Sequence, residues 1–157
     1  MIGEVSCDYN GVGGLVIKDS FPDDWEGTPW HLHPYQSALI EVKLGIVCIE
    51  TKAGVEIVGA GESYVIPAGI AHRIHNEALD GGQIELTLTP SYDGEMFLQG
   101  LANCARHGKS SLLQIALMNR LSDHPGFYYA RIPIWLQNGL FMLLAPVARL
   151  LGYKARY

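Results

Sequence analysis

The chain has 157 residues, a formal net charge of −5 and three cysteines. This length suits one domain with a real hydrophobic core, and three widely spaced cysteines outside any CxxC pattern argue against a disulfide framework or a zinc ribbon. The first residues contain an early acid and no basic region ahead of an apolar run, so we expect no signal peptide and a cytoplasmic location.

Charge is distributed unevenly along the chain. Residues 1–94 contain 14 acidic and 4 basic side chains, a net charge of −10, whereas residues 95–157 contain 2 acidic and 7 basic side chains, a net charge of +5. We expect the basic part to dock on the acidic part of the same chain or of a second copy. An anionic membrane surface is the less favoured alternative. Nucleic acid is not expected, because the basic residues are scattered and no aromatic platform lies among them.

From residue 14 to residue 90, short runs of β-branched residues alternate with turn signals. The breaks contain Gly, Pro, Asn and Asp, and this spacing predicts an antiparallel all-β sandwich or barrel. Two of the breaks, residues 51–54 (TKAG) and 79–82 (LDGG), have the composition of hairpin connections.

After residue 90 the pattern becomes helical. Residues 95–108 and 111–124 each contain an apolar stripe at helical spacing. Asp93 is the expected N-cap of the first of these helices, and Gly108 is the expected stop.

The segment between Arg131 and Arg149 is almost entirely apolar (IPIWLQNGLFMLLAPVA). It is interrupted by two prolines and an amide pair, and it is shorter than the ~20 apolar residues of a spanning helix. We expect a helix that is buried or forms an interface. A helix lying in a membrane interface and a true span are the alternatives.

Four of the six histidines lie in the β region. His31 and His33 are two residues apart, so in a strand they point to the same face. His72, from another strand, is the natural third member of a three-nitrogen site. Imidazole suits zinc, iron, nickel and copper, but an HxH pair in a half-polar strand is by itself more often a hydrogen-bonded surface pair than a metal site.

The stretch from Gly61 to Asn76 (GESYVIPAGIAHRIHN) resembles the second motif of the cupin family, G-x5-P-x-G-x2-H-x3-N. Every required position is present, namely Gly61, Pro67, Gly69, His72 and Asn76. The glycines also suit turn positions with positive φ, where a Cβ is costly. Pro67 suits the end of a strand, because it leaves no ladder donor unpaired.

The first cupin motif is met only in part. His31, His33 and Gly45 fit the pattern, but Gly27 is too near to be its leading glycine, and the position of the family's metal-binding glutamate is occupied by Ala38. The resemblance is strong over about residues 27–90. The remaining chain looks like the helical extension of a group of bacterial single-barrel cupins.

The resemblance implies an all-β fold, a cupin-type antiparallel β-barrel (double-stranded β-helix or jelly roll) with C-terminal α-helices. We accordingly divide the chain into a barrel domain, residues 1–92, and a helical extension, residues 93–157, that packs on the barrel or on a dimer partner. Exposed sheet edges and the apolar C-terminal segment both favour a homodimer.

The missing carboxylate leaves three readings open. In the first, His31, His33 and His72 hold a divalent metal with open positions, as in the cupin dioxygenases that also lack the glutamate. In the second, Gln36 adds an oxygen ligand; Glu41 is less suitable, because it has the opposite strand parity and would need a bulge. In the third, no metal binds and the histidines line a polar pocket. The metals considered are Fe, Ni, Zn and Mn.

Other residues near the histidines are candidates through proximity alone. Tyr35, Tyr64 and Arg73 are the candidate substrate contacts, with packing or rim positions as the alternative, and His75 is expected at the surface or at an interface. No nucleophile with an adjacent base is recognisable, so catalytic residues are not assigned. We predict a metal-dependent cupin that is a small-molecule enzyme or binding protein, with dioxygenase-type or isomerase-type chemistry as the enzyme classes to consider. A metal-free ligand-binding or sensor module and a membrane-associated cupin are the rivals.

Overall fold

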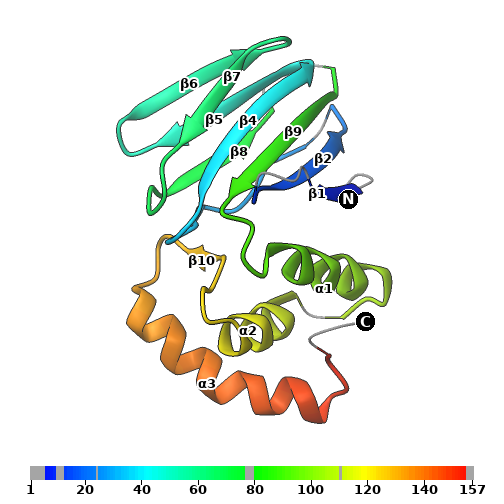
Figure 1. The fold of residues 1–157 in the computed structure, drawn as a ribbon, viewed down its shortest axis with the longest axis vertical. Helices are drawn as coiled ribbons and strands as arrows, with labels where there is room; N and C mark the ends of the chain where they lie inside the picture. Colours follow the sequence, from blue (N-terminus) through cyan, green and yellow to red (C-terminus); the bar gives the residue numbers. More distant parts are fainter. Residues whose placement is uncertain (1–5, 10–12, 24, 77–79, 110, 155–157) are drawn as a thin grey trace.

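The structure is a computed structural model that describes residues 6–9, 13–23, 25–76, 80–109 and 111–154. Its strands form two antiparallel five-stranded sheets that enclose a barrel (Figure 1). In the first sheet the order is β1 (Ser6–Tyr9), β2 (Leu15–Phe21), β9 (Gly82–Thr89), β4 (Ser37–Leu44) and β7 (Ser63–Ile66). In the second sheet it is β10 (Tyr128–Tyr129), β3 (His31–Leu32), β8 (His72–His75), β5 (Ile46–Thr51) and β6 (Gly54–Gly59). The predicted antiparallel barrel is confirmed.

The barrel core follows from the period-two pattern of the strands. In β4, Ala38, Ile40 and Val42 are buried and their neighbours are not, because successive side chains point to opposite faces. They pack against Val47 and Ile49 of β5 in the second sheet, within one hydrophobic cluster. Each fully buried aliphatic side chain of this kind contributes about 1.5–3 kcal/mol, so the two sheets are held face to face.

Two of the expected turn features are present. Gly61 and Gly69 have φ of +87° and +79°, in agreement with the prediction from their motif positions. The connection at 51–54 is a hairpin between β5 and β6. The segment 79–82 is not a second hairpin: it precedes β9, which belongs to the other sheet from β8, and its residue 79 lies outside the described residues.

The three helices lie below one end of the barrel (Figure 1). They are α1 (Gly94–Arg106), α2 (Ser111–Leu121) and α3 (Ile134–Leu150), so the predicted helices are present and the second ends three residues early. Asp93 directly precedes α1, but its carboxylate accepts a hydrogen bond from Ser122 Oγ (2.6 Å) and so ties the start of α1 to the end of α2. Gly108 follows α1 with φ of +61°.

Helix α3 is attached through its polar residues. The buried Gln137 side chain donates to the carbonyl oxygens of Tyr129 and Ile132 (2.8 and 2.7 Å) and accepts from Tyr129 N (3.0 Å). Asn138 accepts from the Tyr128 hydroxyl (2.7 Å). The amide pair that interrupts the apolar segment therefore holds β10, which in turn pairs with β3 of the barrel.

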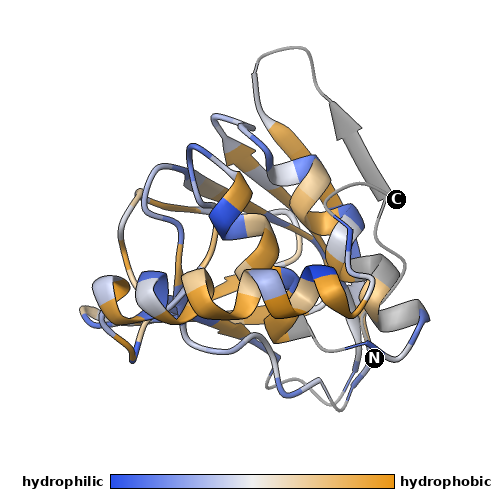
Figure 2. Cartoon of the chain, turned by 90° about the horizontal axis from the view of Figure 1, so that it is seen from below, coloured by the Kyte–Doolittle hydropathy of each residue, from blue (hydrophilic) through white to orange (hydrophobic). Residues whose placement is uncertain are grey.

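The face of α3 that points away from β10 is apolar and exposed. The inner side of α3 buries Gln137, Phe141, Ala145 and Ala148. Most of its other apolar side chains are exposed, and in Figure 2, seen from below, much of the helical ribbon is coloured as hydrophobic. The predicted buried or interface helix is thus buried along one side only. Within the described ranges, no helix has the length and hydropathy required to cross a membrane.

Candidate metal centre

Three histidines meet at the end of the barrel that faces the helices. His31 of β3 and His72 of β8 are directly opposite each other in the sheet, and His33 follows β3. The ring centroids are 4.3 Å apart for His31–His72, 5.0 Å for His31–His33 and 5.5 Å for His33–His72. One ring nitrogen from each lies within 4.8 Å of the others, which is close enough for a shared metal ion.

Backbone carbonyls set the tautomer of all three rings. The Nδ1 atoms of His31 and His72 lie 2.7 Å from Pro29 O and 2.9 Å from Ile70 O, and His33 Nδ1 is hydrogen-bonded to Gly126 O. A carbonyl oxygen can only accept, so each Nδ1 donates and each Nε2 keeps its lone pair. This arrangement is the usual orientation of metal-ligating histidines. The donor set therefore fits a divalent transition metal.

Burial keeps these imidazoles neutral. Desolvation, together with the neighbouring His72 and His33, lowers the pKa of His31 from 6.5 to about 3. Desolvation also lowers the pKa of His33 to about 4, against the opposing effect of its bond to Gly126, and it lowers the pKa of His72. Neutral imidazoles are the form that binds a metal, so the site needs no proton release to accept one.

Ala38, which stands where the cupin resemblance expects the metal-binding glutamate, and Gln36, its proposed substitute, are both buried. Ala38 belongs to β4, and Gln36 directly precedes that strand. Ala38 is 2% exposed and belongs to the barrel core. Gln36 is also buried, and its Nε2 donates to Pro90 O (2.7 Å) and Ser91 O (3.3 Å), which leaves Oε1 as the available acceptor. Glu41 pairs instead with Lys43 (3.4 Å) on the outer face. Gln36 as a fourth ligand stays a prediction.

A cavity of about 190 Å³ lies between the three histidines and the helices. His31, His33 and Gln36 are among its polar lining residues, and Phe127 stacks on the His31 ring with centroids 5.0 Å apart and planes at 16°. Most of the other lining side chains are apolar and come from β2, β9, α1 and α2, among them Ile17, Leu86, Phe97, Leu101 and Met118. The sequence pattern contains no signal for these wall residues, because the approach of the helices brings them there.

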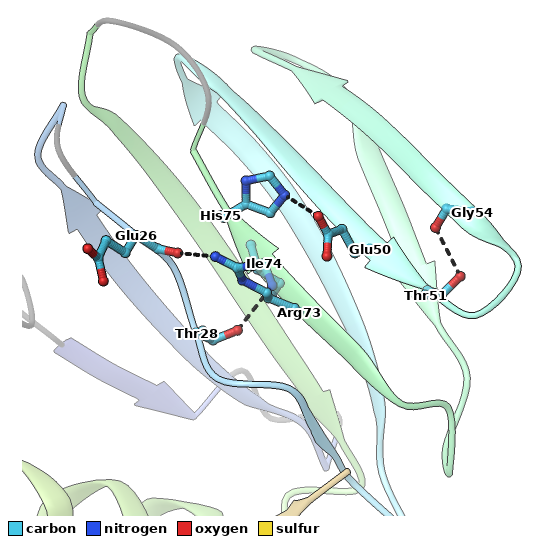
Figure 3. Close-up of polar contacts among 8 residues, drawn as sticks. All are labelled: Glu26, Thr28, Glu50, Thr51, Gly54, Arg73, Ile74 and His75. Carbon is cyan, nitrogen blue, oxygen red and sulfur yellow. Dashed lines mark hydrogen bonds and ion pairs between the residues drawn. The ribbon is translucent and has the colours of Figure 1, made fainter. Parts of the chain in front are cut away.

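The other three candidate contacts lie elsewhere. Tyr35 is 52% exposed and meets His124 edge-on (5.7 Å between centroids). Tyr64 packs against the barrel core, and Arg73 donates to Glu26 O at 2.8 Å (Figure 3). In the described part of the chain none of the three borders the cavity, and their role as substrate contacts remains a prediction.

His75 is buried within the chain, contrary to the expectation of a position at the surface or at an interface. It is 7% exposed, and its Nε2 lies 3.0 Å from Glu50 Oε1 (Figure 3). Glu50 belongs to β5, which pairs with β8, so a cross-strand partner compensates the buried ring. His75 thus belongs to a polar pair separate from the three-histidine cluster.

Gly27 has a structural role although it does not fit the first motif. Its φ is +92°, and a Cβ there would collide with Ile74 O and His75 Cβ. This close approach allows Thr28 to bond the backbone of Ile74 through both its N (2.8 Å) and its Oγ1 (3.0 Å; Figure 3). The segment before β3, which contains Gly27 and Thr28, is therefore fastened to β8.

The family model for the cupin domain matches residues 20–81. The chain therefore contains a cupin domain. The match ends before β9 and the helices, so the cupin domain supplies the three histidines and Gln36 but not most of the cavity wall. Ala38, at the position of the family's glutamate, remains the main departure from the cupin pattern.

Several solved structures are similar to about half of this chain. A cupin-2 domain-containing protein from Shewanella frigidimarina has 19% identity and a TM-score of 0.47 over 54% of this chain and 78% of its own. A conserved Klebsiella pneumoniae protein with a double-stranded β-helix domain has 16% identity and a TM-score of 0.49 over 55% and 76%. A sugar phosphate isomerase of the cupin superfamily from Silicibacter pomeroyi has 19% and 0.44 over 49% and 50%. No curated protein matches the chain.

Proposed function

We propose that this cupin binds a small molecule beside a divalent metal held by His31, His33 and His72. The observation that supports the proposal is the shared tautomer: all three Nδ1 atoms face backbone carbonyls, so three unprotonated Nε2 atoms remain on rings that lie together. Burying three imidazoles together inside a barrel costs folding free energy, because each ring leaves a nitrogen lone pair without water. A bound metal or ligand would offset that cost.

The proposed chemistry is of the dioxygenase or isomerase type, with Fe, Ni, Zn or Mn as the metals to test. Three protein nitrogens leave coordination positions open, and a bound ion there would supply a Lewis acid. The chain's own contribution is the cavity: apolar walls that exclude water, Phe127 against His31, and Gln36 held by the backbone of residues 90 and 91. A metal-free ligand-binding module is the rival function.

Metal analysis of protein purified without added metal tests the proposal. The full chain should contain, or take up on titration, one equivalent of one of these metals, and His72→Ala should abolish that uptake. His75→Ala is the matched control, because it removes a second buried imidazole from the same strand, outside the cluster. Absence of stoichiometric uptake in the wild type would favour the metal-free rival. Equal loss of uptake in both variants, with folding intact by circular dichroism, would show that the three-histidine cluster is not the metal site.

A second function that we propose is attachment to an anionic membrane surface through α3. The exposed apolar side chains of α3 and the residues beside it include Trp135 (74%), Leu143 (68%), Leu150 (87%), Leu151 (59%) and Met142 (59%). Because the Gln137 amide faces inward, the helix presents an apolar face to the surroundings. An exposed apolar patch of this extent marks a surface that binds a protein or a membrane. An amphipathic helix of this kind can lie in a bilayer interface.

The positive charge around α3 favours an anionic lipid surface over a second copy of the chain as the partner of its apolar face. Residues 125–157 contain four basic side chains and no acidic one. Arg131 and Arg149 lie just before and near the end of α3 and are exposed. Two copies meeting through α3 would bring like charges together, whereas basic residues near an anionic surface are each attracted by about 1 kcal/mol.

Vesicle flotation tests the membrane proposal. The full chain should float with phosphatidylcholine vesicles that contain phosphatidylserine, and it should float less with phosphatidylcholine alone. Leu143→Gln with Leu150→Gln should abolish flotation, and since both side chains are exposed the fold should tolerate the change. Arg149→Gln should weaken binding to anionic vesicles only. No flotation, together with a dimer in light scattering that the double variant converts to a monomer, would assign the face to a second copy instead.

A further inference from the structure

The cavity beside the three histidines is built mainly by residues outside the cupin match. Of its lining residues, His31, His33 and Gln36 belong to residues 20–81, and the others come from β2, β9, the connection from β9 to α1, the helices and the segment after α2. The features that select a ligand are therefore best sought in these helices and in this segment.

The size and lining of the cavity indicate one small ring. Its volume is about 190 Å³, and a cavity of about 150 Å³ is large enough for benzene. Phe97 and Phe127 are 6.1 Å apart between centroids on one side, with Leu101 and Met118 among the other walls. Among the described residues that line it there is no Lys or Arg, so a phosphate or carboxylate has no counter-charge from these side chains.

One polar atom on this wall has no hydrogen-bond partner within the residues that the structure describes. Asn119, on α2, borders the cavity and is 6% exposed. Its Nδ2 donates to Phe127 O at 2.6 Å, and this bond fixes the orientation of the amide, because a carbonyl oxygen can only accept. The buried Oδ1 has no hydrogen-bond partner among the described residues. An unsatisfied buried acceptor is costly, so a partner is expected from whatever occupies the cavity.

We propose that Asn119 selects the ligand: its Oδ1 accepts a hydrogen bond from a hydroxyl or N–H group on a small molecule that is otherwise apolar and about the size of one ring. The Asp93 carboxylate, another acceptor at the cavity, is already bonded by Ser122. This inference rests on the small-molecule function proposed above, and it is independent of whether a metal binds.

The experiment compares phenol with anisole, two rings of similar size of which only phenol has a donor. Binding to the full chain, as purified and after EDTA treatment, is followed by chemical shifts in two-dimensional NMR spectra. Phenol should bind roughly tenfold more tightly than anisole, as expected for one buried hydrogen bond. The side-chain amide resonances of Asn119 should shift with phenol and not with anisole.

Two variants locate the selectivity. Asn119→Leu should bring the two affinities to within about twofold, since it removes the acceptor. Met118→Leu, a change of shape on the same wall, should affect both ligands alike and keep their ratio. If Asn119→Leu does not fold, the Asn119 resonances of the wild type decide the matter.

Equal binding of phenol and anisole by the wild type, or a preference that survives in Asn119→Leu, would overturn the proposal and would indicate that water satisfies Oδ1. No binding of either ring would overturn it as well. Because the EDTA-treated protein is included, these outcomes are distinguishable from a failure of the metal site, which is measured by metal uptake.

Discussion

His31 and His72 are direct cross-strand partners on β3 and β8, with their ring centroids 4.3 Å apart. Each ring donates from Nδ1 to the carbonyl oxygen of the residue two positions earlier, Pro29 and Ile70 respectively. The same local bond thus orients both rings from opposite strands. His33 reaches its carbonyl only across the chain, at Gly126, so the segment after α2 completes the arrangement.

A glutamate at position 38 should make the stability of the barrel depend on metal. Ala38 is 2% exposed in the core, and a buried carboxylate without a partner costs several kcal/mol. We expect Ala38→Glu to lower the melting temperature of metal-free protein and to show a larger rise than the wild type on addition of zinc. The uncharged control is Ala38→Gln. Zinc-induced shifts of the same size in both variants would show that the side chain does not reach a metal.

Acid should destabilise the metal-free protein through its buried imidazoles. The folded-state pKa values of His31 and His33, about 3 and about 4, lie below the usual 6.5. The stability that their neutral forms contribute is complete above pH 6.5 and is lost as the pH falls toward these lower values. Within that window the free energy of unfolding should fall by about 1.4 kcal/mol per pH unit for each imidazole.

Urea unfolding of EDTA-treated protein at a series of pH values measures this dependence. His33→Leu should reduce the slope, because one proton fewer is taken up on unfolding. An unchanged slope in His33→Leu would mean that other groups govern the acid sensitivity.

Gly27 should be less replaceable than Gly61, although both have positive φ. A Cβ at Gly61 meets no atom within 4 Å, so Gly61→Ala should cost only the backbone term of about 1–2 kcal/mol. A Cβ at Gly27 would in addition collide with Ile74 O and His75 Cβ, and we expect a further loss of about 1–3 kcal/mol. Denaturant unfolding compares the two variants. Equal losses would show that the segment before β3 is not held closely against β8.

Gln137 should matter more for stability than its neighbour Asn138. Gln137→Ala leaves the backbone groups of Tyr129 and Ile132 without their partners, a loss of about 2–4 kcal/mol from several buried bonds. Asn138→Ala removes one bond, to the Tyr128 hydroxyl, and should cost about 1 kcal/mol. Hydrogen exchange should show faster exchange at β10 in the first variant. Similar losses in both variants would contradict the role assigned to Gln137.

The barrel and its histidines can be predicted from the sequence because local pattern determines them. The alternation of buried and less buried side chains along β4, and the positive φ at Gly61 and Gly69, depend only on residues close in the sequence. The HxH spacing likewise brings His31 and His33 to one face. His75 is different: its burial depends on Glu50, a partner 25 residues away on a paired strand. Periodicity alone contains no information about such a pair.

The cavity could not be predicted, because distant segments build it. Phe127 and Asn119 reach the histidines only when α2 and the following residues pack below the barrel. The orientation of α3 could not be predicted either, because the pattern of an apolar helix with two amides does not indicate that Gln137 is buried while many apolar side chains are exposed. Both features depend on tertiary contacts that helical spacing does not encode.

The most direct measurement of the central proposal is the state of the three imidazoles during a zinc titration. Long-range ¹H–¹⁵N NMR spectra distinguish protonated from unprotonated ring nitrogens in the metal-free full chain. We expect Nδ1–H tautomers at His31, His33 and His72, and a shift of all three Nε2 resonances that saturates at one equivalent of zinc, with His75 unaffected. An Nε2–H tautomer at any of the three, or Nε2 resonances that do not move with zinc, would contradict the proposed metal site.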